Sequence, residues 1–366
     1  MSQPSVRWGF LSTAGIARKN WEALLRSGNG TLAAVASRDV SKAAAFIAEN
    51  QREAAYDSAP RALGSYEELL ADPSIQAVYI PLPTGLRKEW VIRAAQAGKH
   101  VLCEKPCALN ATDLAEMTGA CQANNVQFMD GVMFMHTRRL EAIRKVLDVG
   151  ELGTLRRLHA QFSFNAPADF LAGNIRMSSS LEPQGCLGDL GWYTIRMCLW
   201  TLGYAMPERV AARLIAAQGR PDSPDAVPTE FSAELFFPGG VTASFYNSFQ
   251  TEHQQLFVAA GSGGYLTLDD FVLPFFGSET TFSVTKSAFE VDGCQFNMAP
   301  RRRQVSTAEY SNNHASAQET NLFRTFNDLV LAGSPDPHWP EIALKTQRVM
   351  DACLESARKD GVVVRI

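Results

Sequence analysis

The sequence has no hydrophobic run long enough to cross a membrane. A membrane-spanning helix needs about 18 or more consecutive apolar residues, and no such stretch occurs in the 366 residues. The first residues, Met1 to Ser5, lead directly into an apolar segment without the charged and hydrophobic regions of a secretory signal. We therefore expect a cytoplasmic protein without a membrane partner.

Cysteine is scarce, and neither sign of charge is in clear excess. The seven cysteines are odd in number and widely spread, which does not suit a disulfide framework, and none has the spacing of a zinc site. We therefore expect reduced thiols and no metal ion. The 34 basic and 38 acidic residues give a net charge of −4, and the only basic run is Arg301 to Arg303. This balance argues against a nucleic-acid partner.

The composition that remains is typical of a globular enzyme. Hydrophobic residues make up 46% and charged residues 20% of the chain. At about 150 residues per domain, this length favours two domains.

The first 130 residues alternate short apolar segments with helical ones. Strands are expected at 6–11, 31–36, 77–80, 100–103 and 127–130, and helices at 15–25, 40–50, 86–97 and 112–125. Ser65 and Glu68 have the spacing of a capping box that begins one more short helix. Strands separated by helices predict right-handed crossovers and a parallel, doubly wound Rossmann sheet in residues 1–130.

After about residue 150 the pattern changes to longer, strand-like alternation. Strands are expected at 155–164, 231–237, 241–246, 255–260, 265–268 and 281–285, with helices at 191–202 and 341–358 and loops at 220–228 and 297–316. The segments 231–237 and 241–246 flank Pro-Gly-Gly and predict a hairpin. The predicted fold class is therefore α/β, with a second, α+β domain over 131–366 that has a large, mostly antiparallel open sheet.

Aromatic residues of that sheet suggest how the chain assembles. Phe237, Phe245, Tyr246 and Phe249 would place apolar side chains on both faces of the hairpin, more than one covered face requires. We therefore expect a homodimer or a higher homo-oligomer that forms through the exposed face of this sheet.

The first strand leads into a turn of small residues, Ser12-Thr13-Ala14-Gly15-Ile16. In a dinucleotide fold, small residues here let backbone N–H groups approach the pyrophosphate. The usual leading glycines are replaced by Ser12 and Ala14, so an ordinary strand–helix turn explains the segment equally well. Its place as the first strand–helix turn favours the nucleotide site.

The second strand ends at Ser37-Arg38-Asp39. A hydroxyl and a guanidinium suit a ribose 2′-phosphate, whereas a free 2′-hydroxyl prefers a carboxylate. The pair Ser37 and Arg38 therefore predicts NADP, with NAD also possible, and Asp39 is interpreted as a helix cap.

Glu104-Lys105-Pro106 follows the strand at 100–103, at the edge where parallel sheets bind ligands. Together with residues 78–84 (VYIPLPT) and the turn at Ser12, it closely resembles the Gfo/Idh/MocA oxidoreductase family, and residues 34–39 resemble its glucose–fructose oxidoreductase and dihydrodiol dehydrogenase branch. The resemblance implies NAD(P)-dependent hydride transfer. It implies cofactor contacts from Ser12, Thr13, Ala14, Gly15, Ile16, Ser37, Arg38, Pro81, Leu82, Pro83, Arg87, Glu104, Lys105 and Pro106.

The segment 185–193 (GCLGDLGWY) resembles the family's second-domain motif. The resemblance implies that Asp189 and Tyr193 contact substrate, and their four-residue spacing places both on one face of a helix. It also implies that Lys105 lies between nicotinamide and substrate. His136 and Arg176 are further predicted substrate contacts. Four residues depart from the family pattern. Tyr193 replaces a common histidine, which favours the sugar- and diol-type branch, Thr84 and Arg87 stand where asparagine and histidine are usual, and Cys186 lies in a normally glycine-rich run.

Hydride transfer at a carbinol carbon needs a group that exchanges the hydroxyl proton. We assign this role to Tyr193, with Lys105 as an electrostatic partner, because a neighbouring ammonium stabilises a phenolate. Asp189 would bind a substrate hydroxyl, and direct proton transfer by Lys105 remains an alternative. The expected substrate is a sugar, a keto-sugar or a cyclic polyol or diol. An NAD-dependent glycosidase of the same fold and a catalytically silent NADP-binding regulator are the alternative functions.

Overall fold

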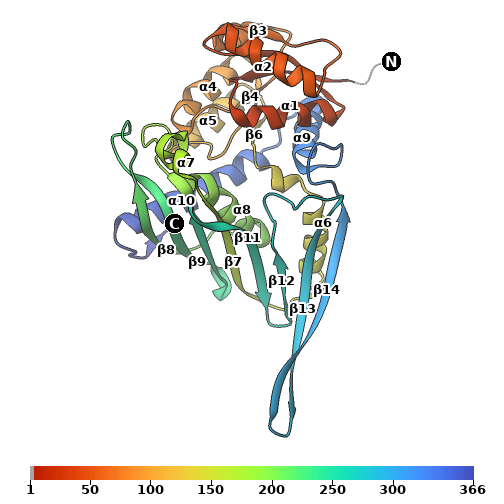
Figure 1. Ribbon diagram of the computed structural model, residues 1–366, viewed down its shortest axis with the longest axis vertical. Helices are drawn as coiled ribbons and strands as arrows, with labels where there is room; N and C mark the ends of the chain where they lie inside the picture. The colour runs from red at the N-terminus through yellow and green to blue at the C-terminus, as the bar shows by residue number, and fades with distance from the viewer. Residues whose placement is uncertain (1–3) are drawn as a thin grey trace. The chain divides into compact units, whose positions relative to one another are not determined.

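A parallel sheet of six strands forms the centre of the first of two units in the computed structural model, which describes residues 4–366 (Figure 1). The strand order is β3-β2-β1-β4-β5-β6, and every neighbouring pair is parallel. The strands are β1 (Val6–Leu11), β2 (Gly30–Ala36), β3 (Arg61–Leu63), β4 (Ala77–Ile80), β5 (His100–Cys103) and β6 (Phe128–Asp130). The predicted Rossmann sheet is therefore confirmed. The predicted lack of a secretory signal falls partly on residues 1–3, which lie outside the described residues.

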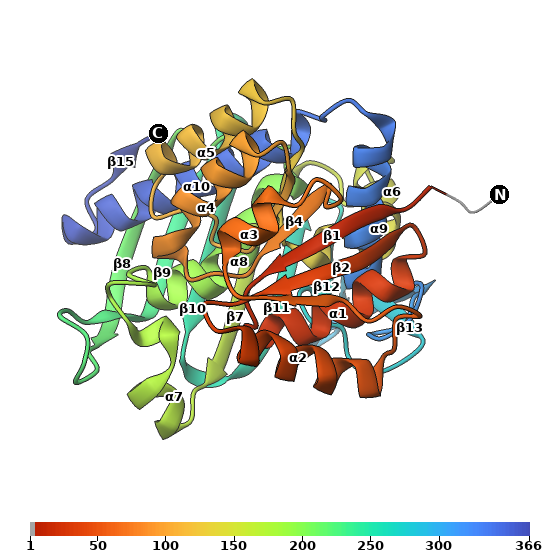
Figure 2. The ribbon, with the colours of Figure 1, turned by 90° about the horizontal axis from the view of Figure 1, so that it is seen from above.

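Helices cover both faces of this sheet (Figure 2). The helical elements of this unit are α1 (Gly15–Ser27), α2 (Val40–Glu53), α3 (Tyr66–Ala71), α4 (Thr84–Gln96), α5 (Ala111–Ala123), the 3-10 turn η1 (Met133–His136) and α9 (Gln318–Ala332). The helix α10 (His338–Arg358) belongs to this unit up to residue 348 and to the second unit from residue 349. Ser65 caps α3 by accepting a hydrogen bond from the Glu68 amide at 3.1 Å, as the capping box predicted. Asp39 caps α2 by accepting from the Ser41 amide at 2.9 Å, and this bond and one from the Ser41 hydroxyl hold the pKa of Asp39 below its usual range.

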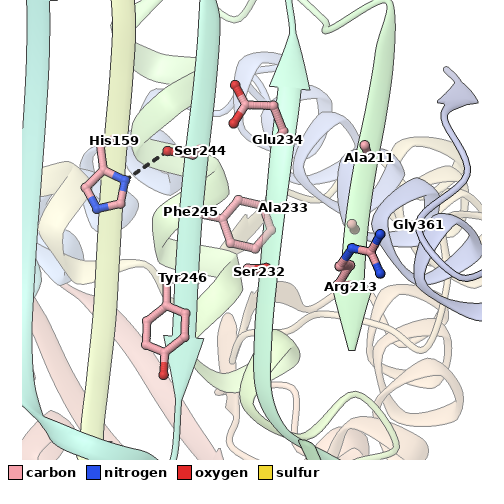
Figure 3. Close-up of a pocket in the computed structure, with 11 residues that line it drawn as sticks. His159, Ala211, Arg213, Ser232, Ala233, Glu234, Ser244, Phe245, Tyr246 and Gly361 are labelled. Atoms are coloured by element: carbon pink, nitrogen blue, oxygen red, sulfur yellow. Dashed lines mark hydrogen bonds between the residues drawn. The ribbon is translucent and has the colours of Figure 1, made fainter. Parts of the chain in front are cut away.

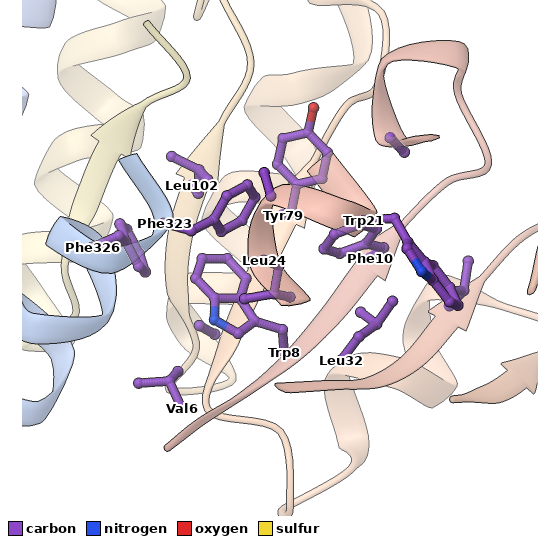
Figure 4. Close-up of a cluster of buried hydrophobic side chains, with 14 of the residues drawn as sticks. Val6, Trp8, Phe10, Trp21, Leu24, Leu32, Tyr79, Leu102, Phe323 and Phe326 are labelled. Atoms are coloured by element: carbon purple, nitrogen blue, oxygen red, sulfur yellow. The ribbon is translucent and has the colours of Figure 1, made fainter. Parts of the chain in front are cut away.

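The core of this unit is aromatic and includes a helix from far along the sequence. Trp8 of β1 contacts Phe323 and Phe326 of α9, with ring centroids 5.2 and 5.0 Å apart (Figure 4). The buried indole N–H of Trp8 donates to the side-chain oxygen of Asn327 at 2.8 Å. We did not predict α9 from the sequence. Three segments therefore make up the first unit, namely the residues up to 136, 178–183 and 312–348.

The second unit contains a sheet of nine strands and comprises residues 137–177, 184–311 and 349–366. Its order is β14-β13-β12-β11-β7-β10-β9-β8-β15, and only β7 and β10 pair in parallel. The strands are β7 (Leu155–Asn165), β8 (Arg209–Gln218), β9 (Val227–Phe236), β10 (Thr242–Ser248), β11 (Gln250–Gly261), β12 (Gly264–Leu268), β13 (Glu279–Asp292), β14 (Gln295–Ala308) and β15 (Val364–Arg365). The predicted antiparallel character and the β9–β10 hairpin are confirmed.

Short helical elements complete this unit. They are α6 (Arg139–Asp148), α7 (Ala168–Gly173), the 3-10 turns η2 (Ile175–Met177) and η4 (Pro238–Gly240), the π-helical turn η3 (Leu187–Gly191) and α8 (Trp192–Thr201). The functional division of the chain into 1–130 and 131–366 stays a prediction. None of the helices within residues 4–366 is long and apolar enough to cross a membrane.

The interpretation of residues 297–316 as a loop is wrong for residues 297–308, which belong to β14. β14 pairs with β13 along its whole length, from Glu279 opposite Ala308 to Asp292 opposite Gln295. Pro300 and the three arginines that follow it obscured the strand, because such residues are unusual in strands that are covered on both sides.

The aromatic residues Phe237, Phe245, Tyr246 and Phe249 were expected to place apolar side chains on both faces of the hairpin, but only Tyr246 of the four is partly exposed. Phe237, Phe245 and Phe249 are buried, with at most 4% of their surface exposed. The open face instead carries polar groups, with His159 and Ser244 hydrogen-bonded at 2.9 Å beside Glu234 and Tyr246 (Figure 3). The open face therefore lacks the apolar side chains that were expected to be buried between subunits. The homo-oligomer itself stays a prediction.

We expect Asn327→Ala to lower the free energy of unfolding by about 1–3 kcal/mol, because the buried indole N–H of Trp8 would lose its acceptor. Denaturant unfolding measured by tryptophan fluorescence tests this expectation. Leu331→Ala on the exposed side of the same helix is the control and should cost no more than about 0.5 kcal/mol. Equal effects of the two variants would contradict the role of this hydrogen bond.

Candidate active site

The predicted cofactor contacts of the first unit gather at one edge of its sheet. Strands β1, β2, β4 and β5 are neighbours, and each ends directly before a predicted contact segment, at Ser12, Ser37, Pro81 and Glu104 respectively. Because the carboxyl ends of parallel strands lie at the same edge, the structure places these four segments side by side. The strand order reverses between β1 and β4, which is where such sheets bind ligands.

The turn after β1 has the geometry of a phosphate-binding turn. Ser12 has a φ of +127°, a conformation that favours glycine, and its side-chain oxygen accepts from the amide of Ala14 at 3.1 Å. Helix α1 then begins without a side-chain cap, and apart from its chain neighbours and its own helix backbone no atom lies within 4 Å of the position that a Cβ on Gly15 would occupy. An uncapped helix N-terminus that faces open space suits a pyrophosphate. The residues present therefore fit a dinucleotide.

Tyr66 of α3, which we did not predict as a site residue, lies near both the turn and the end of β2. Burial raises the pKa of Tyr66, while the charge of Arg38 and a hydrogen bond with the Ser12 side chain oppose that rise. The Tyr66 ring packs edge-on against Trp90, with centroids 4.8 Å apart. Ser37 is buried and Arg38 is exposed. The hydroxyl of Tyr66 therefore lies beside both predicted cofactor segments, a position that follows only from the folded arrangement of α3.

Arg87 fastens the turn that carries Lys105. Its buried guanidinium donates to the Leu82 carbonyl at 2.7 Å, to the Thr84 hydroxyl at 3.0 Å and to the Pro106 carbonyl. We predicted a cofactor contact for Arg87, and these bonds within the chain favour a positioning role. Two of the departures from the family pattern, Thr84 and Arg87, thus belong to one network.

Glu182 completes this network. Its carboxylate accepts from the Thr84 amide at 2.9 Å and from the Thr84 hydroxyl at 2.6 Å. The short segment 178–183 belongs to the first unit although its neighbours along the chain do not. The segment is anchored further by the Gly85 amide, which donates to the Leu181 carbonyl at 2.9 Å.

Glu104 and Lys105 differ in their surroundings. Glu104 is buried and accepts a hydrogen bond from the Tyr79 hydroxyl at 2.6 Å. Lys105 is only partly buried, and its peptide bond to Pro106 is cis. Glu104 therefore anchors the turn in the core, and Lys105 is the more accessible residue of the two.

In the second unit, the structure brings Asp189 and Arg176 together. The Arg176 Nε lies 2.7 Å from an Asp189 carboxylate oxygen, so the two predicted substrate contacts form an ion pair. Asp189 lies in the π-helical turn η3, and Tyr193 follows in the first turn of α8. Tyr193 is nearly buried, at 6% exposed, and its ring lies edge-on to Phe162 at 5.7 Å. We predicted an ordinary helix from Gly191, and a π-turn before it is a feature often found at functional sites.

Two glycines and one cysteine shape this turn. A Cβ on Gly185 would lie 2.1 Å from the Pro228 carbonyl oxygen, and its φ of +47° also favours glycine. A Cβ on Gly191 would lie 2.7 Å from a methyl group of Leu187. Cys186 is fully buried, and burial raises the pKa of its thiol well above the usual range. Cys186 therefore fills space in the turn and is not a reactive thiol.

His136 belongs to the first unit, where it ends η1. Its ring stacks on Trp339 at 4.9 Å with an angle of 15° between the planes. The side-chain amide of Asn321 also donates to the His136 carbonyl at 3.2 Å. These contacts give His136 a clear packing role, and its predicted contact with substrate stays a prediction.

Comparisons with known proteins agree with both units. Residues 6–132 match the family described as oxidoreductase family, NAD-binding Rossmann fold, and residues 140–267 match the GFO/IDH/MocA C-terminal domain. The chain is 33% identical over 312 residues to the D-xylose 1-dehydrogenase (NADP(+)) 2 of Haloferax volcanii, which covers 83% of this chain and 90% of that protein. It is 32% identical over 269 residues to the bovine trans-1,2-dihydrobenzene-1,2-diol dehydrogenase, covering 73% and 75% of the two chains.

A solved structure extends the comparison to nearly the whole chain. The 3-ketoreductase KijD10 from Actinomadura kijaniata, crystallised with NADP and TDP-benzene, is 25% identical and superposes with a TM-score of 0.81. The superposition covers 96% of this chain and 98% of that one.

We expect Ser12→Gly to be more stable than Ser12→Ala by about 1–2 kcal/mol, because only glycine adopts this backbone conformation without strain. Both variants lose the hydroxyl, so the difference isolates the conformational cost. Denaturant unfolding of the two variants provides the measurement. If the alanine variant were as stable as the glycine variant, the turn would not hold the conformation described.

Proposed function

Because this chain belongs to the Gfo/Idh/MocA family of oxidoreductases, we propose that it is an NADP(H)-dependent enzyme that transfers hydride to or from a CH–OH carbon of a sugar, a keto-sugar or a cyclic polyol or diol. The observation that carries the proposal is the gathering of the Ser12 turn, the Ser37-Arg38 pair and the Lys105 turn at one edge of the parallel sheet. The named activities of the xylose and dihydrodiol dehydrogenases support this range of substrates.

The preference for NADP(H) rests on the end of β2. Arg38 is exposed and is free of any carboxylate within ion-pair distance among the described residues, so its guanidinium is available to a 2′-phosphate. The hydroxyls of Ser37 and Tyr66 lie in the same region and can donate to phosphate oxygens. The turn at Ser12 to Ile16 would hold the pyrophosphate, and residues 81–83 and 104–106 would line the remaining cofactor path. When bound, the cofactor supplies or accepts the hydride.

The remaining chemistry is assigned to three side chains. Tyr193 exchanges the proton of the substrate hydroxyl, and Lys105 supplies the positive charge that stabilises its phenolate. Asp189, oriented by Arg176, accepts a hydrogen bond from a second hydroxyl of the substrate. A buried phenol next to aromatic rings, such as Tyr193 beside Phe162, is held in one orientation for this transfer.

A screen of cofactor consumption tests the proposal. Sugars, polyols, diols and keto-sugars are each supplied with NADP+ or NADPH, and the absorbance of the reduced nicotinamide is followed. We expect turnover with at least one of these classes. Hydrolysis of an aryl glycoside without added cofactor would identify the glycosidase instead, and cofactor binding without any turnover would identify the silent regulator. A cytoplasmic location and a homo-oligomeric state are also part of this proposal.

We expect Arg38→Ala to weaken NADP(H) binding by about 1.5–3 kcal/mol, the contribution of a hydrogen bond to a charged group. Binding of NAD(H), which has no 2′-phosphate, should hardly change. Calorimetric titration with both cofactors measures the difference, and Arg52→Ala in the last turn of α2 is a matched surface control. An equal loss of affinity for both cofactors would show that Arg38 does not bind the 2′-phosphate.

We expect Tyr193→Phe to reduce kcat by about 10²–10⁴-fold with little change in cofactor affinity, because the ring is kept and only the hydroxyl is lost. Lys105→Ala should be at least as damaging. If the two side chains act as a unit, the double variant is little worse than the worse single one. A Tyr193→Phe enzyme with near-normal kcat beside an inactive Lys105→Ala enzyme would assign proton transfer to Lys105.

A further inference from the structure

Helix α4 begins without a cap from its own sequence. The residue before it makes no side-chain cap hydrogen bond, although the first four N–H groups of an α-helix have no acceptor within the helix. A segment from much later in the chain, residues 178–183, supplies two acceptors, and we call it the strap. The Thr84 amide donates to the Glu182 carboxylate at 2.9 Å, and the Gly85 amide donates to the Leu181 carbonyl at 2.9 Å.

The strap lies directly on the first turn of α4. A Cβ on Gly85 would lie 2.9 Å from the backbone oxygen of Ser180. A larger residue at this position would therefore have to push the backbone of the strap away. Glycine is required here for close approach and not for its backbone conformation, since the position is helical.

The Thr84 hydroxyl joins the strap to a buried cation. It donates to the Glu182 carboxylate at 2.6 Å and accepts from the Arg87 guanidinium at 3.0 Å. The other acceptors of that guanidinium are the neutral carbonyls of Leu82 and Pro106. Arg87 is only 5% exposed, and a buried charge is costly unless it is compensated. Glu182 therefore offsets the charge of Arg87 through a single hydroxyl.

This network ends at the turn that carries Lys105. Its three steps are the hydrogen bonds from Thr84 to Glu182, from Arg87 to Thr84 and from Arg87 to Pro106. Each bond has one charged partner, and such bonds are roughly twice as strong as those between neutral groups. The Thr84 hydroxyl oxygen also lies 3.4 Å from the Pro106 carbonyl oxygen.

We propose that Glu182 and Thr84 are positioning residues for Lys105, which they hold in place through Arg87 and the Pro106 carbonyl. The effect on catalysis rests on the proposed function, in which Lys105 supplies the positive charge next to the reacting hydroxyl. The restraint on the turn does not depend on that chemistry. The inference gives the two unusual residues at the start of α4 a joint role with an acidic residue nearly 100 positions away.

Two variants of Thr84 test the hydroxyl. Thr84→Val keeps the shape of the side chain and should lower kcat at least tenfold, because a small displacement of a catalytic group is costly. Thr84→Ser keeps the hydroxyl and should recover most of the lost rate. The dissociation constant of NADPH, measured by calorimetry, should stay close to the wild-type value in both, since the Ser12 turn and Arg38 take no part in the network. A role in stability alone would shift the unfolding temperature without this difference in kcat.

Gly85→Ala displaces the strap without removing a polar group. It should lower kcat in the same way as Thr84→Val. Gly119→Ala in α5 is the matched control, because apart from its chain neighbours and its own helix backbone no atom lies within 4 Å of the added Cβ. Alanine favours a helix more than glycine does, so neither change should weaken the helix that carries it.

Glu182→Gln tests the charge. The amide oxygen can still accept from the Thr84 amide, but the negative charge that offsets Arg87 is lost, so kcat should fall at least tenfold. Combined with Thr84→Val, it should be little worse than the worse single variant, because both changes interrupt one path. Glu89→Gln on the same helix, with a side chain 63% exposed, is the control and should leave kcat unchanged. Effects that multiply in the double variant would contradict a shared path.

Hydrogen–deuterium exchange supplies a readout that needs no substrate. The backbone amides of residues 102–109 should exchange at least tenfold faster in Thr84→Val, Glu182→Gln and Gly85→Ala than in the wild type, because the turn loses its anchor. Thr84→Ser and Gly119→Ala should retain slow exchange over this segment.

The outcomes separate this inference from the proposed chemistry. A wild type without turnover on any substrate class would count against the chemistry, and the exchange measurement would still test the restraint. Near-normal kcat in both Thr84→Val and Glu182→Gln, beside an active wild type, would overturn the positioning role. Wild-type exchange over residues 102–109 in all three disruptive variants would overturn it as well.

Discussion

Every strand of a parallel sheet ends at the same edge, and the proposed chemistry of this protein depends on that constraint. Four short segments that are up to 94 positions apart in the sequence, from Ser12 to Pro106, become neighbours because β1, β2, β4 and β5 lie side by side. The side chains then divide into two kinds. Arg87, Glu104 and Glu182 hold the backbone of the turns, whereas Arg38 and Lys105 remain accessible to a ligand.

The turn after β1 shows that a glycine pattern can be lost while its geometry is kept. Ser12 adopts a glycine-like φ, and its hydroxyl accepts a hydrogen bond from the Ala14 amide. That bond offsets part of the conformational cost of a side chain there. A search for glycines alone therefore undervalues this turn, and its position after the first strand is the better signal.

How much the sequence could predict depends on where each element finds its partners. The buried strands of the first unit and the hairpin of β9 and β10 are recognisable because local patterns specify them. Helix α9 was missed because its buried face includes Asn327 and Glu319, polar residues that make sense only beside Trp8 and Lys19. β14 was missed because Pro300 and the three arginines after it are exposed on an edge strand whose one partner is β13. The contacts of Tyr66 and the pairing of Arg176 with Asp189 depend on tertiary structure, so spacing alone could not give them.

The packing of α9 on β1 also determines when the first unit can complete its core during synthesis. At about 5–20 residues per second, a ribosome needs roughly 15–60 s after Trp8 to reach Phe323 and Phe326. Throughout that interval the nucleotide-binding sheet lacks one wall of its aromatic core and the acceptor for its indole N–H. The nine-stranded sheet is synthesised in the meantime, up to β14. The unit whose synthesis begins first is therefore among the last parts of the chain to complete its core. A nascent chain that stops before α9 exposes this incomplete core to chaperones and proteases.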